Sequence, residues 1–186
     1  MVFLQTGDWH LGKIFYEHSL IEDQTYFLQQ IQKELEKERN NGTPYDALVV
    51  SGDIYDRAVP PPDAVTLFSS FLYNVHTEFP ELEMFFISGN HDSPDRLSFA
   101  SELLLYEKVH ICTDVKKIAE PVIVGKGDEK AAVYQIPFLT PGVLPAEKTD
   151  EILRSQQDLT AKALSIIKEA HKKNYAELPS VISAHL

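Results

Sequence analysis

Cysteine, long hydrophobic runs and positive charge are all scarce in this sequence. Its one cysteine, Cys112, excludes an intramolecular disulfide and any cysteine-based zinc site, so a bound metal must be held by His, Asp, Glu or Asn side chains. No segment approaches the roughly 18 apolar residues that cross a bilayer. The first ten residues, MVFLQTGDWH, have neither the basic region nor the long apolar region of a signal peptide. We therefore expect a cytoplasmic protein.

The shortage of positively charged residues limits how the protein can bind nucleic acid. Lysine and arginine number 17 against 28 acidic residues, which gives a formal net charge of −11. This balance argues against a protein that binds nucleic acid through a basic surface. It leaves open an enzyme whose bound cations contact phosphate. The 186 residues, 44% of them hydrophobic, are enough for one globular domain with a full core.

Short runs of apolar, β-branched or aromatic residues alternate with longer segments of helical period, and this pattern predicts an α/β fold. Strands are predicted at residues 2–6, 47–51, 84–88, 109–112, 121–124, 131–136 and 180–184. Helices are predicted from about residue 27 to the stop signal at 40–42, from residue 60 onward, from residue 93 through 104, and from about 148 to 173. Residues 126–129 have the composition of a hairpin turn.

Metal-ligand residue types follow four of the predicted strands at the point where each strand ends. Asp8 and His10 follow the first strand, Asp53 the second, Asn90 and His91 the third, and His185 the last. Each motif alone is typical of turn and capping chemistry. We expect these four strands to be central and parallel, and ligands bind where the carboxyl ends of parallel strands meet. A carboxylate such as that of Asp53 can bridge two cations about 3.5–4 Å apart, and a mixed nitrogen and oxygen donor set suits Mn²⁺, Fe or Zn²⁺ better than Ca²⁺.

The same motifs carry a resemblance to a known family. The segments Asp8-Trp9-His10-Leu11-Gly12, Gly52-Asp53-Ile54-Tyr55-Asp56-Arg57, Gly89-Asn90-His91-Asp92 and Ala184-His185-Leu186 resemble those of the calcineurin-like metallophosphoesterases. Within that family they are most similar to the nuclease subunits of bacterial complexes that repair DNA double-strand breaks. The resemblance covers nearly the whole chain and implies layered β-sheets flanked by helices.

The resemblance implies a role for each motif residue. Asp8 and His10 would hold one divalent cation, Asn90 and His185 a second, and Asp53 would bridge them, with Mn²⁺ as the expected metal. His91 would approach the scissile phosphate to stabilise the transition state or protonate the leaving oxygen, and Asp56 would orient His91. Asp92 would anchor its loop.

The family also implies partners and a longer chain. DNA would be the substrate, an ATPase subunit with long coiled coils would be the partner, and two copies would pair through the helices around residues 63–77 and 94–107. Family members carry two further histidine ligands in a later Gly-His-x-His motif. We therefore expect residues 1–186 to be the N-terminal part of a nuclease domain, with weaker metal occupancy.

Two alternatives remain open at this stage. The first is a phosphatase or phosphodiesterase of the same family that acts on proteins or small molecules. Protein phosphatases typically show Gly-Asn-His-Glu, whereas Asp92 stands at the fourth position here, which favours the nuclease. The second is a dimerisation or scaffold module without a complete metal site, an alternative that the missing histidines support.

Overall fold

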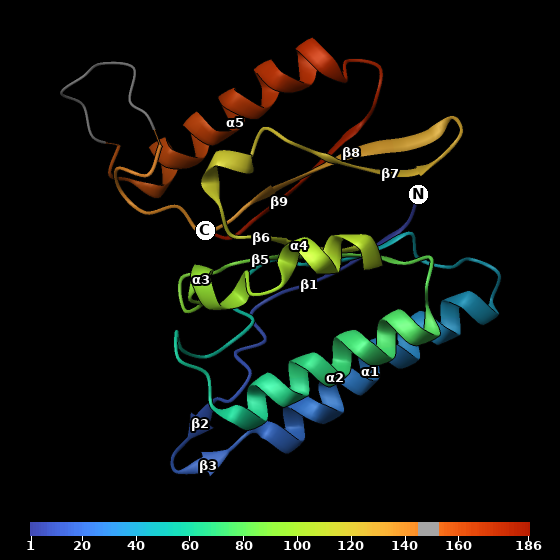
Figure 1. Cartoon of the computed structure of the whole chain (residues 1–186), viewed down its shortest axis with the longest axis vertical. Helices are drawn as coiled ribbons and strands as arrows, with labels where there is room; N and C mark the ends of the chain where they lie inside the picture. Colours follow the sequence, from blue (N-terminus) through green and yellow to red (C-terminus); the bar gives the residue numbers. More distant parts are fainter. Residues whose placement is uncertain (145–152) are drawn as a thin grey trace.

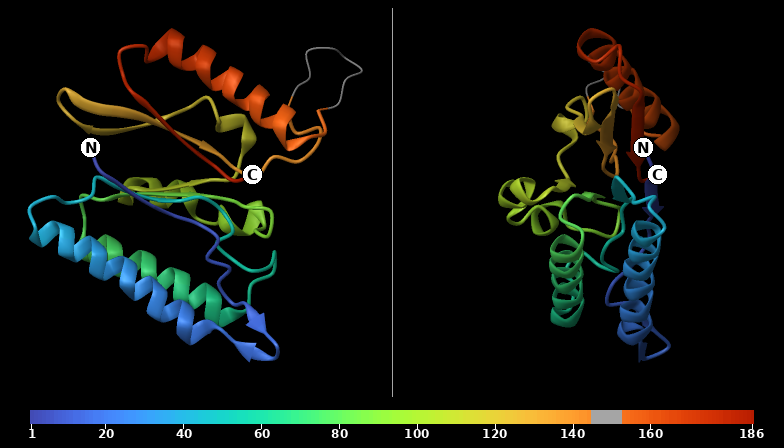
Figure 2. Two further views of the ribbon diagram at one scale, coloured as in Figure 1. Left: turned by 180° about the vertical axis from the view of Figure 1, so that it is seen from behind. Right: turned by 90° about the vertical axis from the view of Figure 1, so that its right-hand side faces the viewer.

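The protein has four layers in the order helices, sheet, sheet, helix. A computed structural model describes residues 1–144 and 153–186. In Figure 1, helices α1 (Ile21–Asn40) and α2 (Pro62–Glu78) form the lowest layer and α5 (Gln156–Asn174) the uppermost, with two β-sheets between them. The side view in Figure 2 shows the same succession of layers. This confirms the predicted fold class of layered sheets flanked by helices.

The first sheet is entirely parallel. Its strands are β1 (Phe3–Thr6), β4 (Ala47–Val50), β5 (Glu83–Ile87) and β6 (Val109–Cys112), in the spatial order β1-β4-β5-β6. Each strand is reached from the one before through a helical crossover, as parallel pairing requires. All four carboxyl ends therefore lie at the same edge, which is where the first three motifs emerge.

The second sheet contains β7 (Val122–Lys126), β8 (Glu129–Ile136) and β9 (Ser180–Ala184), in that order. Strands β7 and β8 form an antiparallel hairpin around Gly127, which confirms the predicted turn. Strand β9, which leads into His185, pairs with β8 in parallel and does not belong to the first sheet. The four motif-bearing strands are parallel to their neighbours, as expected, but β1 and β9 are edge strands, so the expectation that all four are central is wrong for these two.

The alternation of side chains along the strands explains why the layers stack. In β4, Leu48 and Val50 face α1 and α2, whereas Ala47 and Val49 face the second sheet. In β8, Val133 packs between the two sheets, whereas Ala132 and Tyr134 pack against α5. Strands that are buried on both faces read as nearly continuous apolar runs, and this is the pattern of residues 47–50.

The third predicted helix is broken in the structure. Residues 94–107 form α3 (Pro94–Leu97), α4 (Ser101–Leu104) and the 3-10 turn η1 (Leu105–Glu107). The break lies at Ala100, whose φ of 59° is left-handed and cannot continue a right-handed helix. The apolar spacing alone did not reveal this break.

The remaining elements are short. Strands β2 (Ile14–Phe15) and β3 (His18–Ser19) form a small hairpin after β1, and η2 (Val115–Lys117) follows β6. The predicted start of the fourth helix near Lys148 lies outside the described residues. Among the helices that the structure describes, none is both long and apolar enough to cross a membrane.

Candidate metal centre

Backbone hydrogen bonds join the loops that follow β1 and β4. The amide of Asp8 donates to the Gly52 carbonyl at 3.1 Å, and the amide of His10 donates to the Asp53 carbonyl at 2.9 Å. Asp8, His10 and Asp53 all have positive φ angles, between 45° and 53°. Such values are uncommon for residues other than glycine and cluster at functional sites. The fold holds the two loops in this conformation, and their side chains meet as a result.

Asp8, His10 and Asp53 form the first group of metal-ligand side chains. One ligand atom from each lies within 4.8 Å of the other two, and His10 Nε2 is 3.6 Å from Asp53 Oδ2. Two atoms that each lie about 2.1 Å from one cation are roughly 3.0–3.6 Å apart for bond angles of 90–120°. The His10–Asp53 pair therefore has the spacing of two ligands of one divalent cation, and Asp8 lies close enough to be a candidate third ligand.

His185, Asn90 and Asp53 form the second group. The Nδ1–H of His185 donates to the Ser51 carbonyl at 2.8 Å, which in a neutral ring leaves a lone pair on Nε2. That Nε2 lies 2.9 Å from Asn90 Oδ1 and 3.7 Å from Asp53 Oδ2. With a neutral ring, the His185 Nε2, Asn90 Oδ1 and Asp53 Oδ2 atoms are all acceptors and face one another without a hydrogen-bond donor. A cation between them resolves this arrangement, so the donor set fits a metal ion.

Asp53 belongs to both groups and is only 3% exposed. Its Oδ1 accepts from the His91 amide at 2.9 Å, while its Oδ2 faces both His10 and His185. Two glycines make room for this convergence. A Cβ atom on Gly89 would collide with the Asp53 carboxylate, and one on Gly52 would collide with the His185 ring. The carboxylate has the position that a bridging ligand needs.

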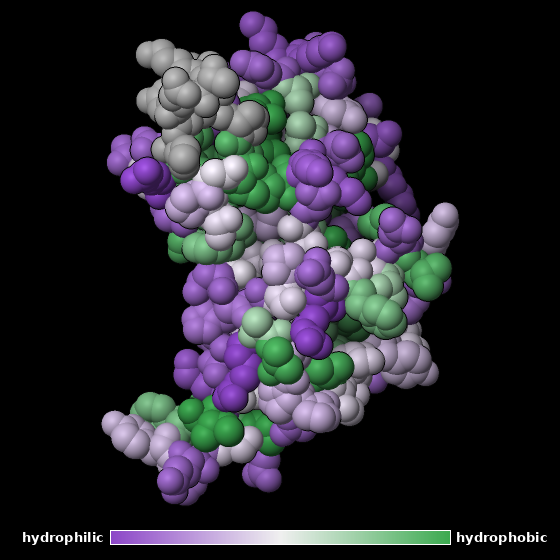
Figure 3. All heavy atoms as spheres, turned by 60° about the vertical axis from the view of Figure 1, so that its left-hand side comes forward, coloured by the Kyte–Doolittle hydropathy of each residue, from purple (hydrophilic) through white to green (hydrophobic). Residues whose placement is uncertain are grey.

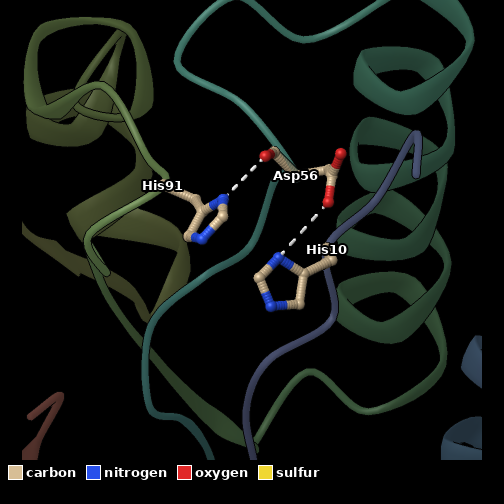
Figure 4. Close-up of side chains that lie close together, drawn as sticks. All are labelled: His10, Asp56 and His91. Atoms are coloured by element: carbon tan, nitrogen blue, oxygen red, sulfur yellow. Dashed lines mark hydrogen bonds and ion pairs between the residues drawn. The ribbon is translucent and has the colours of Figure 1, made fainter. Parts of the chain in front are cut away.

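His91 and Asp56 lie beside the first group, as Figure 4 shows. The Nδ1–H of His91 donates to the main-chain carbonyl of Asp56 at 2.8 Å. The Asp56 carboxylate instead lies 3.6 Å from His10 Nδ1, and it also faces Lys13 at 3.5 Å and Arg57 at 3.9 Å. The expected contact between this carboxylate and His91 is therefore replaced by a main-chain contact, because the side chain turns toward His10 and the two cationic groups.

His10 has a second feature that points to a ligand. Its Nδ1 is buried and has no hydrogen-bond partner among the described residues. The 3.6 Å that separates it from Asp56 Oδ1 is longer than a hydrogen bond. His10, Asp56 and His91 also have ligand atoms within 4.8 Å of one another. A carboxylate next to the outer nitrogen of a histidine is the usual arrangement behind a metal-bound imidazole.

Asp92 anchors the site loops, as expected. Its carboxylate accepts hydrogen bonds from the backbone amides of Ile54 at 3.1 Å, Tyr55 at 2.9 Å and Gly89 at 2.9 Å. Burial raises the pKa of Asp92 above its usual value, against the lowering effect of these three bonds. Burial, with a contribution from the Asp92 charge, raises the pKa of Tyr55 to about 12. Asp92 thus joins the loop after β4 to the loop after β5.

Gln24 is a supporting residue that the sequence did not reveal. It lies in the first turn of α1 and is 9% exposed. Its side-chain amide donates to the carbonyls of His10 at 2.6 Å and Trp9 at 3.2 Å, and its oxygen accepts from the Gly12 amide at 2.9 Å. A glutamine in an amphipathic helix carries no signal of such a role. Trp9 packs against Phe71 with its ring centroid 5.2 Å away and is 4% exposed, so it is a packing residue under the site.

Comparison with known proteins gives the family. The calcineurin-like phosphoesterase profile matches residues 1–184. An SbcD component of the nuclease SbcCD from Staphylococcus saprophyticus is 30% identical over 174 residues, which is 94% of this chain and 44% of that protein. The protein of the same name from Staphylococcus epidermidis is 34% identical over 122 residues, which is 66% of this chain and 31% of that protein. The chain thus spans less than half the length of these relatives. The profile match over nearly every residue shows that the chain belongs to the calcineurin-like phosphoesterase family.

Proposed function

We propose that the chain carries the catalytic site of a two-cation DNA nuclease with exonuclease and endonuclease activity on DNA ends and hairpins. The observation that carries this proposal is the buried Asp53 carboxylate, whose Oδ2 faces Nε2 of both His10, at 3.6 Å, and His185, at 3.7 Å. Both relatives are named as components of the nuclease SbcCD, which supports a nuclease here. Asp92 in the third motif supports the same choice against a protein phosphatase.

The cations, which we propose to be Mn²⁺, would activate the attacking water and neutralise the phosphate oxygens when bound. Asp8, His10 and Asp53 would hold one, and Asn90, His185 and Asp53 the other. The Asp56 carbonyl fixes the His91 ring through Nδ1–H. His91 Nε2, at the opposite side of the ring, is then the atom that would hold the proton for the departing 3′-oxygen. Asp56 would act as a positioning residue for His91 through its main chain.

We also propose partners for this site. By likeness to the relatives, an SbcC-type ATPase would act with the nuclease in DNA repair and recombination. A second copy of the chain would pair through α2 and the segment 94–107. Exposed apolar side chains on these elements support a homodimer: Tyr73 is 70% exposed, Phe99 83% and Leu103 71%. A groove of about 490 Å³ lies between the same elements.

The test compares two substrates and two variants. With added Mn²⁺, we expect cleavage of a DNA oligonucleotide and no release of phosphate from a phosphopeptide. Asp53→Asn should abolish cleavage and weaken Mn²⁺ binding in a calorimetric titration, because it removes the shared charge from both groups. Asp128→Asn, at an exposed position in the turn between β7 and β8, serves as the matched control. Hydrolysis of the phosphopeptide alone would contradict the nuclease proposal. Unchanged Mn²⁺ binding by Asp53→Asn would contradict the metal site.

A further inference from the structure

The β2–β3 hairpin, which follows the loop of Asp8 and His10 in the chain, presents two aromatic rings to solvent. Phe15 is 58% exposed and Tyr16 83% exposed, and their ring centroids lie 4.6 Å apart at an interplanar angle of 79°. The hairpin lies beyond the start of α2 in Figure 1 and projects from the lower left of the molecule in Figure 3. The rings therefore stand away from the protein core.

Tyr16 occupies a backbone conformation that its side chain makes costly. Its φ is 45° and that of the next residue, Glu17, is 68°. Both values are left-handed, and turns that need them are usually formed by glycine, asparagine or aspartate. A bulky residue there is an outlier. The ring is also mostly exposed, so burial does not offset this cost, and backbone outliers of this kind cluster at ligand-binding sites.

The hairpin is fixed to the metal centre at its base. The Lys13 amide donates to the His10 carbonyl at 3.1 Å, and the Leu20 amide donates to the Lys13 carbonyl at 3.0 Å. Gln24 holds the preceding residues through the His10 carbonyl and the Gly12 amide. Any motion of the hairpin base would therefore disturb the loop that carries His10.

The distance from the site suits a nucleic acid strand. Lys13 Nζ lies 3.5 Å from Asp56 Oδ1 at the rim of the site. Three residues of extended chain, from Lys13 to Tyr16, span at most about 11 Å. This upper limit equals the length of about three nucleotides at roughly 3.4 Å each along a stacked strand. Phe15 and Tyr16 therefore lie within three nucleotide lengths of Lys13, whose ammonium group could contact a phosphate.

We propose that Phe15 and Tyr16 form a stacking platform for an unpaired nucleobase two or three nucleotides from the scissile phosphate. This inference rests on the proposed nuclease function and narrows its substrate to DNA with unpaired bases, such as an overhang or a hairpin loop. Every base has a π-face, so the platform would act without sequence preference. The acidic Glu17 at the tip favours an uncharged base over a phosphate at this position.

The first experiment measures binding of fluorescent oligonucleotides to the chain in EDTA at low salt, which separates it from cleavage. We expect Phe15→Ala and Tyr16→Ala each to weaken binding of a single-stranded oligonucleotide by about 5- to 140-fold, with little change for a blunt duplex. Tyr16→Leu should weaken binding as Tyr16→Ala does, because leucine is apolar but lacks a π-face. Tyr26→Ala, at a tyrosine on α1 that is 62% exposed and lies outside the proposed dimer interface, is the matched control.

Three results of that experiment would overturn the proposal. They are no binding of single strands by the natural chain, full binding by Tyr16→Leu, and an equal loss for duplex and single strand. A nuclease that cleaves normally while the platform variants bind as well as the natural chain would contradict the platform alone. Binding that depends on the platform in a chain without DNA cleavage would contradict the nuclease function alone.

A second variant separates ligand contact from a structural role. Tyr16→Gly removes the ring and also relieves the left-handed strain. We expect an unchanged or higher midpoint of urea unfolding together with weaker binding of the single-stranded oligonucleotide. If Tyr16 instead stabilised the hairpin, the midpoint would fall, and the proposal would be wrong.

Discussion

Asp92 offers a test of how the site loops are held in place. Replacing it by alanine leaves three buried backbone amides without an acceptor, those of Ile54, Tyr55 and Gly89. Three hydrogen bonds to a charged group would contribute roughly 5–9 kcal/mol at about 1.5–3 kcal/mol each. Burial of the charge opposes them, as the raised pKa of Asp92 shows. We therefore expect Asp92→Ala to lower the free energy of unfolding by about 3–5 kcal/mol, a large part of the roughly 5–15 kcal/mol typical of a domain.

Asp92→Asn should cost less, and the geometry indicates why. The Ile54 and Gly89 amides both donate to Oδ2, which the asparagine oxygen can replace. The Tyr55 amide donates to Oδ1, where an amide nitrogen would now stand. One bond is lost and two are kept, so we expect a loss of about 1–2 kcal/mol.

The assay is urea unfolding followed by fluorescence of Trp9, the protein's one tryptophan, which is 4% exposed. Asp95→Ala, at an exposed position on α3, should change the free energy of unfolding by no more than about 0.5 kcal/mol. A loss below about 1 kcal/mol for Asp92→Ala would refute the assignment of Asp92 as the anchor.

The pH dependence of these variants has a definite sign. Burial raises the pKa of Asp92 in the folded protein above its usual value of 3.8. The protonated form is thus favoured by folding, and its contribution is present below the unfolded pKa and lost as pH rises through the folded pKa. The stability difference between the natural chain and Asp92→Asn should therefore widen as pH falls from about 7 toward about 4.

Three further predictions follow from single contacts. In calorimetry, Gly52→Ala should weaken Mn²⁺ binding at least about tenfold, because the new Cβ would collide with the His185 ring. Gly42→Ala, at nearly the same φ but in open space, should leave Mn²⁺ binding unchanged. Gln24→Ala should lower the free energy of unfolding by about 1–3 kcal/mol, because buried backbone groups lose their hydrogen-bond partner. Gln29→Ala, at an exposed position of the same helix, should leave this free energy unchanged, and equal losses for the two variants in urea unfolding would contradict the prediction. Burial raises the pKa of Cys112 to about 11 from its usual 9.0, which lowers the fraction of reactive thiolate about 100-fold at about pH 8. Iodoacetamide should therefore label the folded chain about 100-fold more slowly than the urea-unfolded chain, and similar rates would refute this.

The comparison between sequence and structure is most informative at the strand ends. Asp8, Asp53 and Asn90 were predicted to come together because they follow buried parallel strands, and such strands end at one edge of a sheet. The structure brings them together at the edge formed by β1, β4 and β5. His185 was predicted to join them for the same reason, but it arrives from the second sheet. Its place at the site depends on how the two sheets stack.

Local periodicity failed where a single backbone angle decides the structure. Residues 94–107 carry apolar side chains at helical spacing, yet the left-handed Ala100 divides them into short pieces. Such an angle is set by the packing of the surrounding chain, and alanine gives no warning of it. The sequence also did not predict the contacts of Gln24 or of the Asp56 carboxylate. Both side chains contact the loop that carries His10, which is distant from them in the sequence.

The alternation of strands and helices and the residue types at each strand end follow from the sequence alone. These features depend on periodicity and on side-chain chemistry, which are local properties. The tertiary structure was needed to show that β9 pairs with β8, that a single Asp53 oxygen faces both histidines, and that Asp56 contacts His91 through its main chain. Those outcomes depend on the docking of loops and sheets against one another, and the positions of single atoms there follow from long-range packing.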